Sequence, residues 1–100
     1  MTFLSAVKDV FEIEGRGCVL VPGLDQSTSP KIRLRERDPI SLHRPDGSVL
    51  DTRICALEFL DGPNRRWCVP ILLPPNIKKA DVPIGTEIWL LAESGESARG

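Results

Sequence analysis

Proline and glycine recur at short intervals along the sequence, and this spacing limits what the chain can fold into. The 100 residues include nine prolines and eight glycines. Proline lacks a backbone donor and clashes with the preceding turn of a helix, so the intervals leave no room for a helix of more than about 10 residues. We therefore expect a domain made mostly of short strands joined by turns.

Runs rich in aliphatic and β-branched residues lie between the turn residues. The expected strands cover residues 10–14, 18–21, 31–35, 40–44, 49–60, 66–73 and 86–91, after a lead-in or short turn over 1–8. Many short strands with frequent turns are typical of a small barrel or sandwich. The sequence predicts one all-β domain over residues 1–93, a closed or partly open antiparallel β-barrel of about six to seven strands, with a mobile tail over 94–100.

Several turns can be read directly. The triplet Pro45-Asp46-Gly47 has the residue types of a tight turn, so the strands on either side of it should form a hairpin. Gly85 is a further candidate turn residue before the last strand. Pro70 cannot donate a hydrogen bond within a sheet, which places it at an edge strand or a bulge.

An arginine between two glycines interrupts the first pair of strands. Gly15 and Gly17 permit a sharp reversal of the backbone at a hairpin tip. Arg16 between them has three roles open to it: it points into solvent, reaches a phosphate or carboxylate of a partner, or covers apolar surface with its stem.

The charge balance argues against a general nucleic-acid coat. Thirteen basic and fourteen acidic residues give a formal net charge of -1, and 27% of the residues are charged. No uncharged apolar run approaches the roughly 20 residues that span a bilayer, and the N-terminus lacks a basic start followed by an apolar stretch. We expect a soluble, cytoplasmic protein with no membrane partner.

Residues for catalysis are scarce. His43 is the one histidine, tyrosine is absent, and the sequence contains no G-x-S-x-G, H-E-x-x-H or P-loop motif. Cys18, Cys55 and Cys68 form no C-x-x-C pair, so we expect free, reduced, buried thiols. A metal site built from these cysteines and His43 is an alternative that the spacing does not support. The sequence thus predicts no enzyme, no cofactor and no bound metal.

Basic residues recur with a period of two, which places them on one face of an extended strand. Ile32 and Leu34 alternate with them on the opposite face. Such a face is either a solvated surface or a site that binds phosphates of RNA or carboxylates of a protein through guanidinium groups. The candidate binding residues, including the Gly-Arg-Gly arginine and two from the next turn, are Arg16, Lys31, Arg33, Arg35, Arg37, Arg65 and Arg66.

The stretch FEIEGRGCVLVPG resembles the opening hairpin of the β-barrel domain that follows the GTPase domain in translation factors such as elongation factor Tu. The matching positions are Phe11, Ile13, Gly15, Arg16, Gly17, Val19 and Gly23. Further pieces follow in the family's order: Asp38-Pro39-Ile40, Arg53-Ile54-x-x-Leu57-Glu58, residues 69–73, and Asp81-Val82-Pro83-Ile84-Gly85. The resemblance covers about residues 9–91.

In the family this barrel packs on the GTPase domain, and in the elongation factor it helps to hold the acceptor end of aminoacyl-tRNA. The chain departs from the family pattern in two places: Arg37 stands where the family has a glycine before the aspartate, and the glycine before residues 69–73 is lacking. The resemblance therefore implies the fold, and Arg16 as a candidate contact, but not the activity.

Together these features predict a stand-alone, non-catalytic binding module that contacts a protein partner, in a translation-related or regulatory assembly. The alternative is an RNA-binding barrel that uses the basic face and the Gly-Arg-Gly turn. RNA binders usually add stacking aromatic residues, and most aromatic residues here have the pattern of core residues. A homodimer through an exposed edge strand, near Pro70 or the basic face, is also compatible with the sequence.

Overall fold

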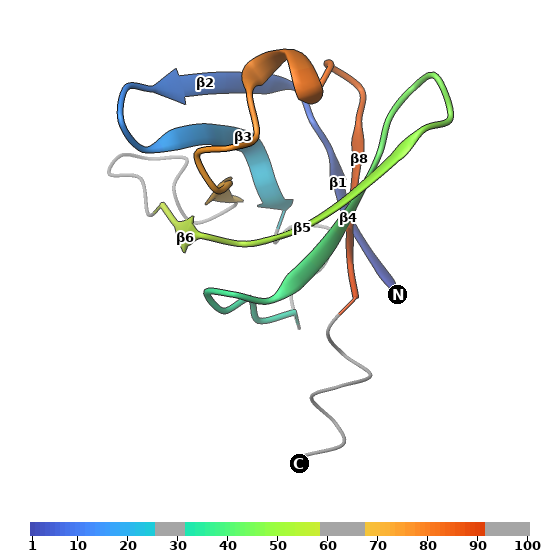
Figure 1. The fold of residues 1–100 in the computed structure, drawn as a ribbon. Helices are drawn as coiled ribbons and strands as arrows, with labels where there is room; N and C mark the ends of the chain where they lie inside the picture. Colours follow the sequence, from blue (N-terminus) through green and yellow to red (C-terminus); the bar gives the residue numbers. More distant parts are fainter. Residues whose placement is uncertain (26–31, 59–67, 92–100) are drawn as a thin grey trace.

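The computed structural model describes residues 1–25, 32–58 and 68–91. These ranges contain the strands β1 (Thr2–Ala6), β2 (Asp9–Ile13), β3 (Gly17–Asp25), β4 (Pro39–His43), β5 (Val49–Arg53), β6 (Ala56–Leu57), β7 (Cys68–Leu72) and β8 (Glu87–Leu90), with the short 3-10 helix η2 (Lys79–Asp81). They form two antiparallel four-stranded sheets, with the orders β1-β8-β4-β5 and β2-β3-β7-β6 (Figure 1).

The all-β prediction is confirmed, but two details of it differ. The described residues form two sheets rather than a closed barrel, and they contain eight strands where six to seven were expected. Within the described ranges, no helix is both long and apolar enough to cross a membrane. The expected tail over 94–100 lies outside the described residues.

The Gly-Arg-Gly segment forms the turn of the β2–β3 hairpin. The backbone N–H of Arg16 donates to the carbonyl of Ile13 at 2.9 Å, and Ile13 pairs with Gly17 in the ladder. Gly17 has a φ of 130° and lies against the backbone carbonyl of Leu73, so no side chain fits there. The turn therefore needs glycine for its conformation and for a close approach to another strand.

Pro45-Asp46-Gly47 joins β4 to β5 in the predicted hairpin. The N–H of Arg44 donates to the carbonyl of Ser48 at 2.8 Å. Asp46 Oδ1 accepts hydrogen bonds from the backbone N–H of Ser48 at 2.9 Å and from its hydroxyl at 2.6 Å. These bonds lower the pKa of Asp46, because they stabilise its charged form.

Two pairs of neighbouring residues join the sheets at corners. Val7 donates its N–H to Thr86 beside β8, and Lys8 donates to Val21 of β3 in the other sheet. The same change of sheet occurs where β5 runs on to β6, because Ile54 donates to Asp38 and Cys55 donates to Leu72. At each corner one continuous backbone belongs to both sheets.

The hydrophobic core lies between the two sheets. Leu42 and Ile88 from one sheet, and Leu20 and Ile71 from the other, are completely buried in one cluster. Burying an aliphatic side chain of this size contributes roughly 1.5–3 kcal/mol to stability. Ile77, from the segment between β7 and β8, joins the same cluster.

Three strand predictions need correction. Residues 1–8 were expected to be a lead-in or a short turn, but β1 lies there and pairs with β8. The described part of 31–35 belongs to neither sheet, and the described part of 49–60 is divided into β5 and β6 at the corner. Pro70 lies in β7, which is an inner strand with β3 on one side and β6 on the other. It follows Val69, where the register with β3 shifts because Gly23 and Leu24 both pair with Val69.

Candidate functional site

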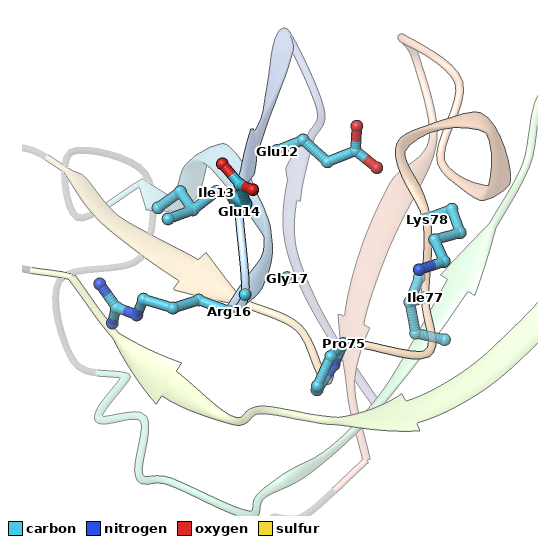
Figure 2. Close-up of a pocket in the computed structure, with 9 residues that line it drawn as sticks. Glu12, Ile13, Glu14, Arg16, Gly17, Pro75, Ile77 and Lys78 are labelled. Carbon is cyan, nitrogen blue, oxygen red and sulfur yellow. The ribbon is translucent and has the colours of Figure 1, made fainter.

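Arg16 extends from the hairpin tip toward the segment that follows β6. Its Nη2 donates to Oε2 of Glu58 at 3.0 Å, and its side chain remains 52% exposed. In Figure 2 the guanidinium group points away from Glu12 and Lys78. An exposed ion pair adds little stability, but here the carboxylate competes with any external phosphate for the guanidinium. Arg16 thus has a partner within the chain.

Three of the other predicted basic residues lie in the segment before β4. Arg33, Arg35 and Arg37 are exposed, whereas Ile32 and Leu34 are half-buried against the core. Within the described ranges, none of the three guanidinium groups has an ion-pair partner. The remaining candidates, all outside the described residues, are Lys31, Arg65 and Arg66.

The segment turns at Arg37, which has a φ of 74°. The turn is hydrogen-bonded on both sides: the N–H of Arg37 donates to the carbonyl of Ile54 at 2.7 Å, and its own carbonyl accepts from Nη1 of Arg53 at 3.0 Å. Asp38 Oδ2 also accepts from the N–H of Arg35 at 2.9 Å. These bonds hold a non-glycine residue in the left-handed region, where it is strained.

Replacing Arg37 tests this strain. We expect Arg37→Gly to be more stable than Arg37→Ala by about 0.5–1 kcal/mol. Both variants remove the guanidinium, but only glycine removes the left-handed strain of about 1–2 kcal/mol. The higher conformational entropy of glycine in the unfolded chain offsets part of this gain. Urea unfolding of the two variants measures the difference. An alanine variant as stable as the glycine variant would contradict the expectation.

An open pocket of about 420 Å³ lies beside the Gly-Arg-Gly turn. Glu12 and Glu14 bring carboxylates to it, and Lys78 brings an ammonium group from the opposite wall (Figure 2). Pro75 and Ile77 form apolar wall between them. The pocket therefore has mixed charge, and Arg16 directs its charge elsewhere, so the pocket does not extend a phosphate-binding surface.

A group of aromatic side chains lies on the outer face of the sheet β1-β8-β4-β5, the face away from the core. Phe3 contacts Trp89 edge to face, with ring centroids 5.2 Å apart. His43 stacks on Trp89 at 5.7 Å. We call Phe3, His43 and Trp89 the aromatic cluster; Phe3 is 42% exposed, and the other two are half-buried.

Neighbouring polar groups hold the aromatic cluster in position. Glu87 Oε1 accepts a hydrogen bond from the indole N–H of Trp89 at 3.1 Å. Nε2 of His43 lies 3.0 Å from the hydroxyl of Ser41, which is itself opposite Trp89 in the ladder. Asp51 of β5 faces Ser41 from the other side. The cluster is therefore an ordered apolar surface beside two exposed carboxylates, those of Glu87 and Asp51.

Sequence reasoning missed the aromatic cluster, although one signal for it exists. In β8, Ile88 and Leu90 are buried, and Glu87 shares the alternate positions with Trp89. A charged residue two positions from a tryptophan in a strand indicates that the tryptophan lies on the solvent side. Phe3 had no such signal because β1 itself was not predicted.

The three cysteines differ in exposure. Cys18 is buried with its thiol 3.5 Å from the carbonyl of Ile77, and burial raises the pKa of this thiol. Cys68 is half-buried and Cys55 is exposed, so the expectation of buried thiols is wrong for Cys55. The described residues include no group of three or more His, Cys, Asp or Glu side chains that could hold a metal ion.

Comparison of the chain with known proteins found no relative. No protein-family model matches the chain, and no curated protein and no solved structure matches it.

Proposed function

We propose that the chain is a non-catalytic binding module and that its aromatic cluster contacts a protein partner. The observation that carries the proposal is the exposure of Phe3 beside Trp89 and His43 on one sheet face. Aromatic residues are enriched at protein interfaces, where they supply large contact areas at a low entropic cost. The indole N–H already bonded to Glu87 needs no partner from outside.

The charges near the aromatic cluster favour a protein over a nucleic acid. Glu87 and Asp51 are exposed on this face, and their carboxylates repel a phosphate backbone. A base also needs an exposed aromatic ring face to stack on, whereas His43 already stacks on Trp89. A protein surface with apolar and basic groups complements this face.

The proposed fold is a partly open form of the translation-factor barrel. The proposed setting of the protein is a translation-related assembly in the cytoplasm. Two observations support this proposal. Two pieces of the resemblance lie at strand boundaries where it would place them, with Gly-Arg-Gly at the β2–β3 turn and Asp38-Pro39-Ile40 at the start of β4, whereas Arg53-Ile54-x-x-Leu57-Glu58 is divided between β5 and β6. The corners after β1 and after β5 also connect the two sheets through continuous backbone, as a barrel requires.

A comparison of matched surface variants tests the protein-binding proposal. We expect the double variant Phe3→Ala, Trp89→Ala to bind its partner at least about tenfold more weakly, because aromatic residues dominate binding energy at interfaces. Phe11→Ala is the control, since Phe11 is 53% exposed but lies on β2 in the other sheet. Tagged wild type and variants are used to capture partners from cell extract, and the affinity of the recovered protein is then measured for each.

The proposal requires a partner that the Phe11 variant keeps and the double variant loses. Recovery of no macromolecule by the wild type would count against it, as would equal binding by the double variant. Thermal unfolding of each variant establishes that lost binding is not lost folding.

RNA binding is the second candidate function, because three exposed arginines lie close together in the segment before β4. Arg53 of β5 donates a hydrogen bond to the carbonyl of Arg37, so the turn at Arg37 contacts the end of β5, and Arg33, Arg35 and Arg37 are exposed. Binding to single-stranded RNA that falls steeply with salt, and is lost in the triple alanine variant of these three arginines, would favour this candidate.

A further inference from the structure

β5 is an edge strand, and the direction of its backbone groups follows from the hairpin. Arg44 donates to the carbonyl of Ser48, and Ile54 donates to the carbonyl of Asp38, so both ends of the β4–β5 ladder are hydrogen-bonded pairs. Hydrogen-bonded and non-bonded pairs alternate in an antiparallel ladder. Counting inward from both ends, residues 50, 52 and 54 direct their N–H and C=O groups toward β4, and residues 49, 51 and 53 direct theirs outward.

No described residue pairs with this outward edge. β5 has β4 as its one neighbour in the sheet. Val49 is 55% exposed, and Asp51 and Arg53 are also exposed. A row of exposed, unpaired backbone groups is a template on which another strand can add.

The sequence of β5 restricts which strand fits. A second copy of β5 running antiparallel must pair odd positions with odd positions, because these carry the outward groups. A register centred on Asp51 places two aspartates directly opposite each other, which is unfavourable. The register centred on Thr52 places Asp51 opposite Arg53 of the second copy, and Arg53 opposite Asp51 of the second copy.

Two further pairs of positions in this register also match. Thr52 faces Thr52 of the second copy, a pair that is favourable across strands. Leu50, half-buried, faces the buried Ile54 of the second copy. The strand is therefore complementary to itself in charge, size and backbone direction, which is the condition for a symmetric contact.

We propose that β5 pairs antiparallel with β5 of a second copy of this chain, in the register centred on Thr52. The β1-β8-β4-β5 sheet of one copy and the same sheet of the other then form one continuous sheet. The twofold axis is perpendicular to this sheet. Both aromatic clusters then lie on the same side, so the dimer presents two copies of the surface at which a partner binds. The dimer does not depend on the proposed partner, and either can be present without the other.

Charge reversal tests the register. Asp51→Arg places arginine opposite arginine at both symmetric positions, and Arg53→Asp places aspartate opposite aspartate. We expect each single variant to dimerise at least about 100-fold more weakly than the wild type. The free-energy cost of two like charges directly opposite each other is several-fold larger than the stabilisation from an exposed ion pair. Sedimentation equilibrium at low ionic strength, at concentrations up to about 1 mM, measures the association.

Mixing the two single variants is the decisive measurement. An Asp51→Arg chain and an Arg53→Asp chain are complementary at both positions, so we expect them to form a heterodimer although neither pairs with itself. Matched controls are Glu36→Arg and Arg35→Asp, which make the same charge changes at exposed residues outside β5 and should dimerise like the wild type.

A wild type that stays monomeric over the whole concentration range overturns the proposal. So does a dimer that survives both single reversals, or a mixture of the two folded variants that fails to associate. Circular dichroism of each variant shows that it is folded. Loss of dimer with partner binding intact in Arg53→Asp, which keeps both carboxylates beside the aromatic cluster, separates this proposal from the proposed function.

Discussion

Gly17→Ala is expected to lower the free energy of unfolding by about 3–5 kcal/mol, combining left-handed strain with a backbone clash. Gly17 has a φ of 130°, and a Cβ built on it meets the carbonyl oxygen of Leu73. The N–H of Leu73 donates to the carbonyl of Cys18 at 2.8 Å, so the two strands cannot separate without losing this bond. Urea denaturation monitored by tryptophan fluorescence measures the loss.

Gly15→Ala is the matched control for Gly17→Ala. Gly15 has a φ of 79°, but a Cβ built on it meets nothing within 4 Å. Its alanine variant should therefore show the conformational strain alone, about 1–2 kcal/mol. Equal losses at the two positions would show that contact with Leu73 is not what excludes a side chain from Gly17.

Gly23→Ala is expected to cost at least as much, about 3–5 kcal/mol, and to leave part of the protein unfolded at physiological temperature. A Cβ on Gly23 meets the carbonyl oxygen of Val69 and comes within 2.8 Å of the Cα of Pro70. The carbonyl of Gly23 accepts a 2.6 Å hydrogen bond from the buried hydroxyl of Ser5, which ties this point to β1. Backbone atoms surround the position, so no side chain can rotate away to make room.

The comparison for Gly23→Ala is Gly47→Ala. Gly47 has a φ of 93° in the exposed β4–β5 turn, with nothing within 4 Å of a Cβ. Thermal unfolding of both variants should give a small decrease in Tm for Gly47→Ala and a far larger one for Gly23→Ala. A Gly23 variant with a Tm close to that of the Gly47 variant would contradict the close approach of β3 and β7.

Local turn chemistry made two hairpins predictable. Gly-Arg-Gly and Pro45-Asp46-Gly47 each fix a reversal through residues that are adjacent in sequence, and both hairpins are present. The period-two pattern after residue 31 also predicted which side chains face solvent, since Arg33 is exposed and Leu34 is half-buried. Whether such a segment pairs with a strand depends on distant residues, and here the described part does not pair.

The candidate surfaces depend on topology, which the sequence does not reveal. The aromatic cluster draws Phe3, His43 and Trp89 from three different strands, and they meet only because β8 lies between β1 and β4. Arg16 and Glu58 are likewise far apart in sequence, and their ion pair requires the hairpin tip to lie near the end of β6. Residue patterns within one strand indicate a face, but not the strand beside it.

We expect the corners at Val7 and Lys8, and at Ile54 and Cys55, to make the unfolding of the two sheets cooperative. Each corner binds one stretch of backbone to both sheets at once, so pulling either sheet apart strains hydrogen bonds in the other. In a sandwich whose sheets are joined only by loops, the two sheets can separate and unfold independently. This chain should instead lose both layers in a single transition, as one foldon.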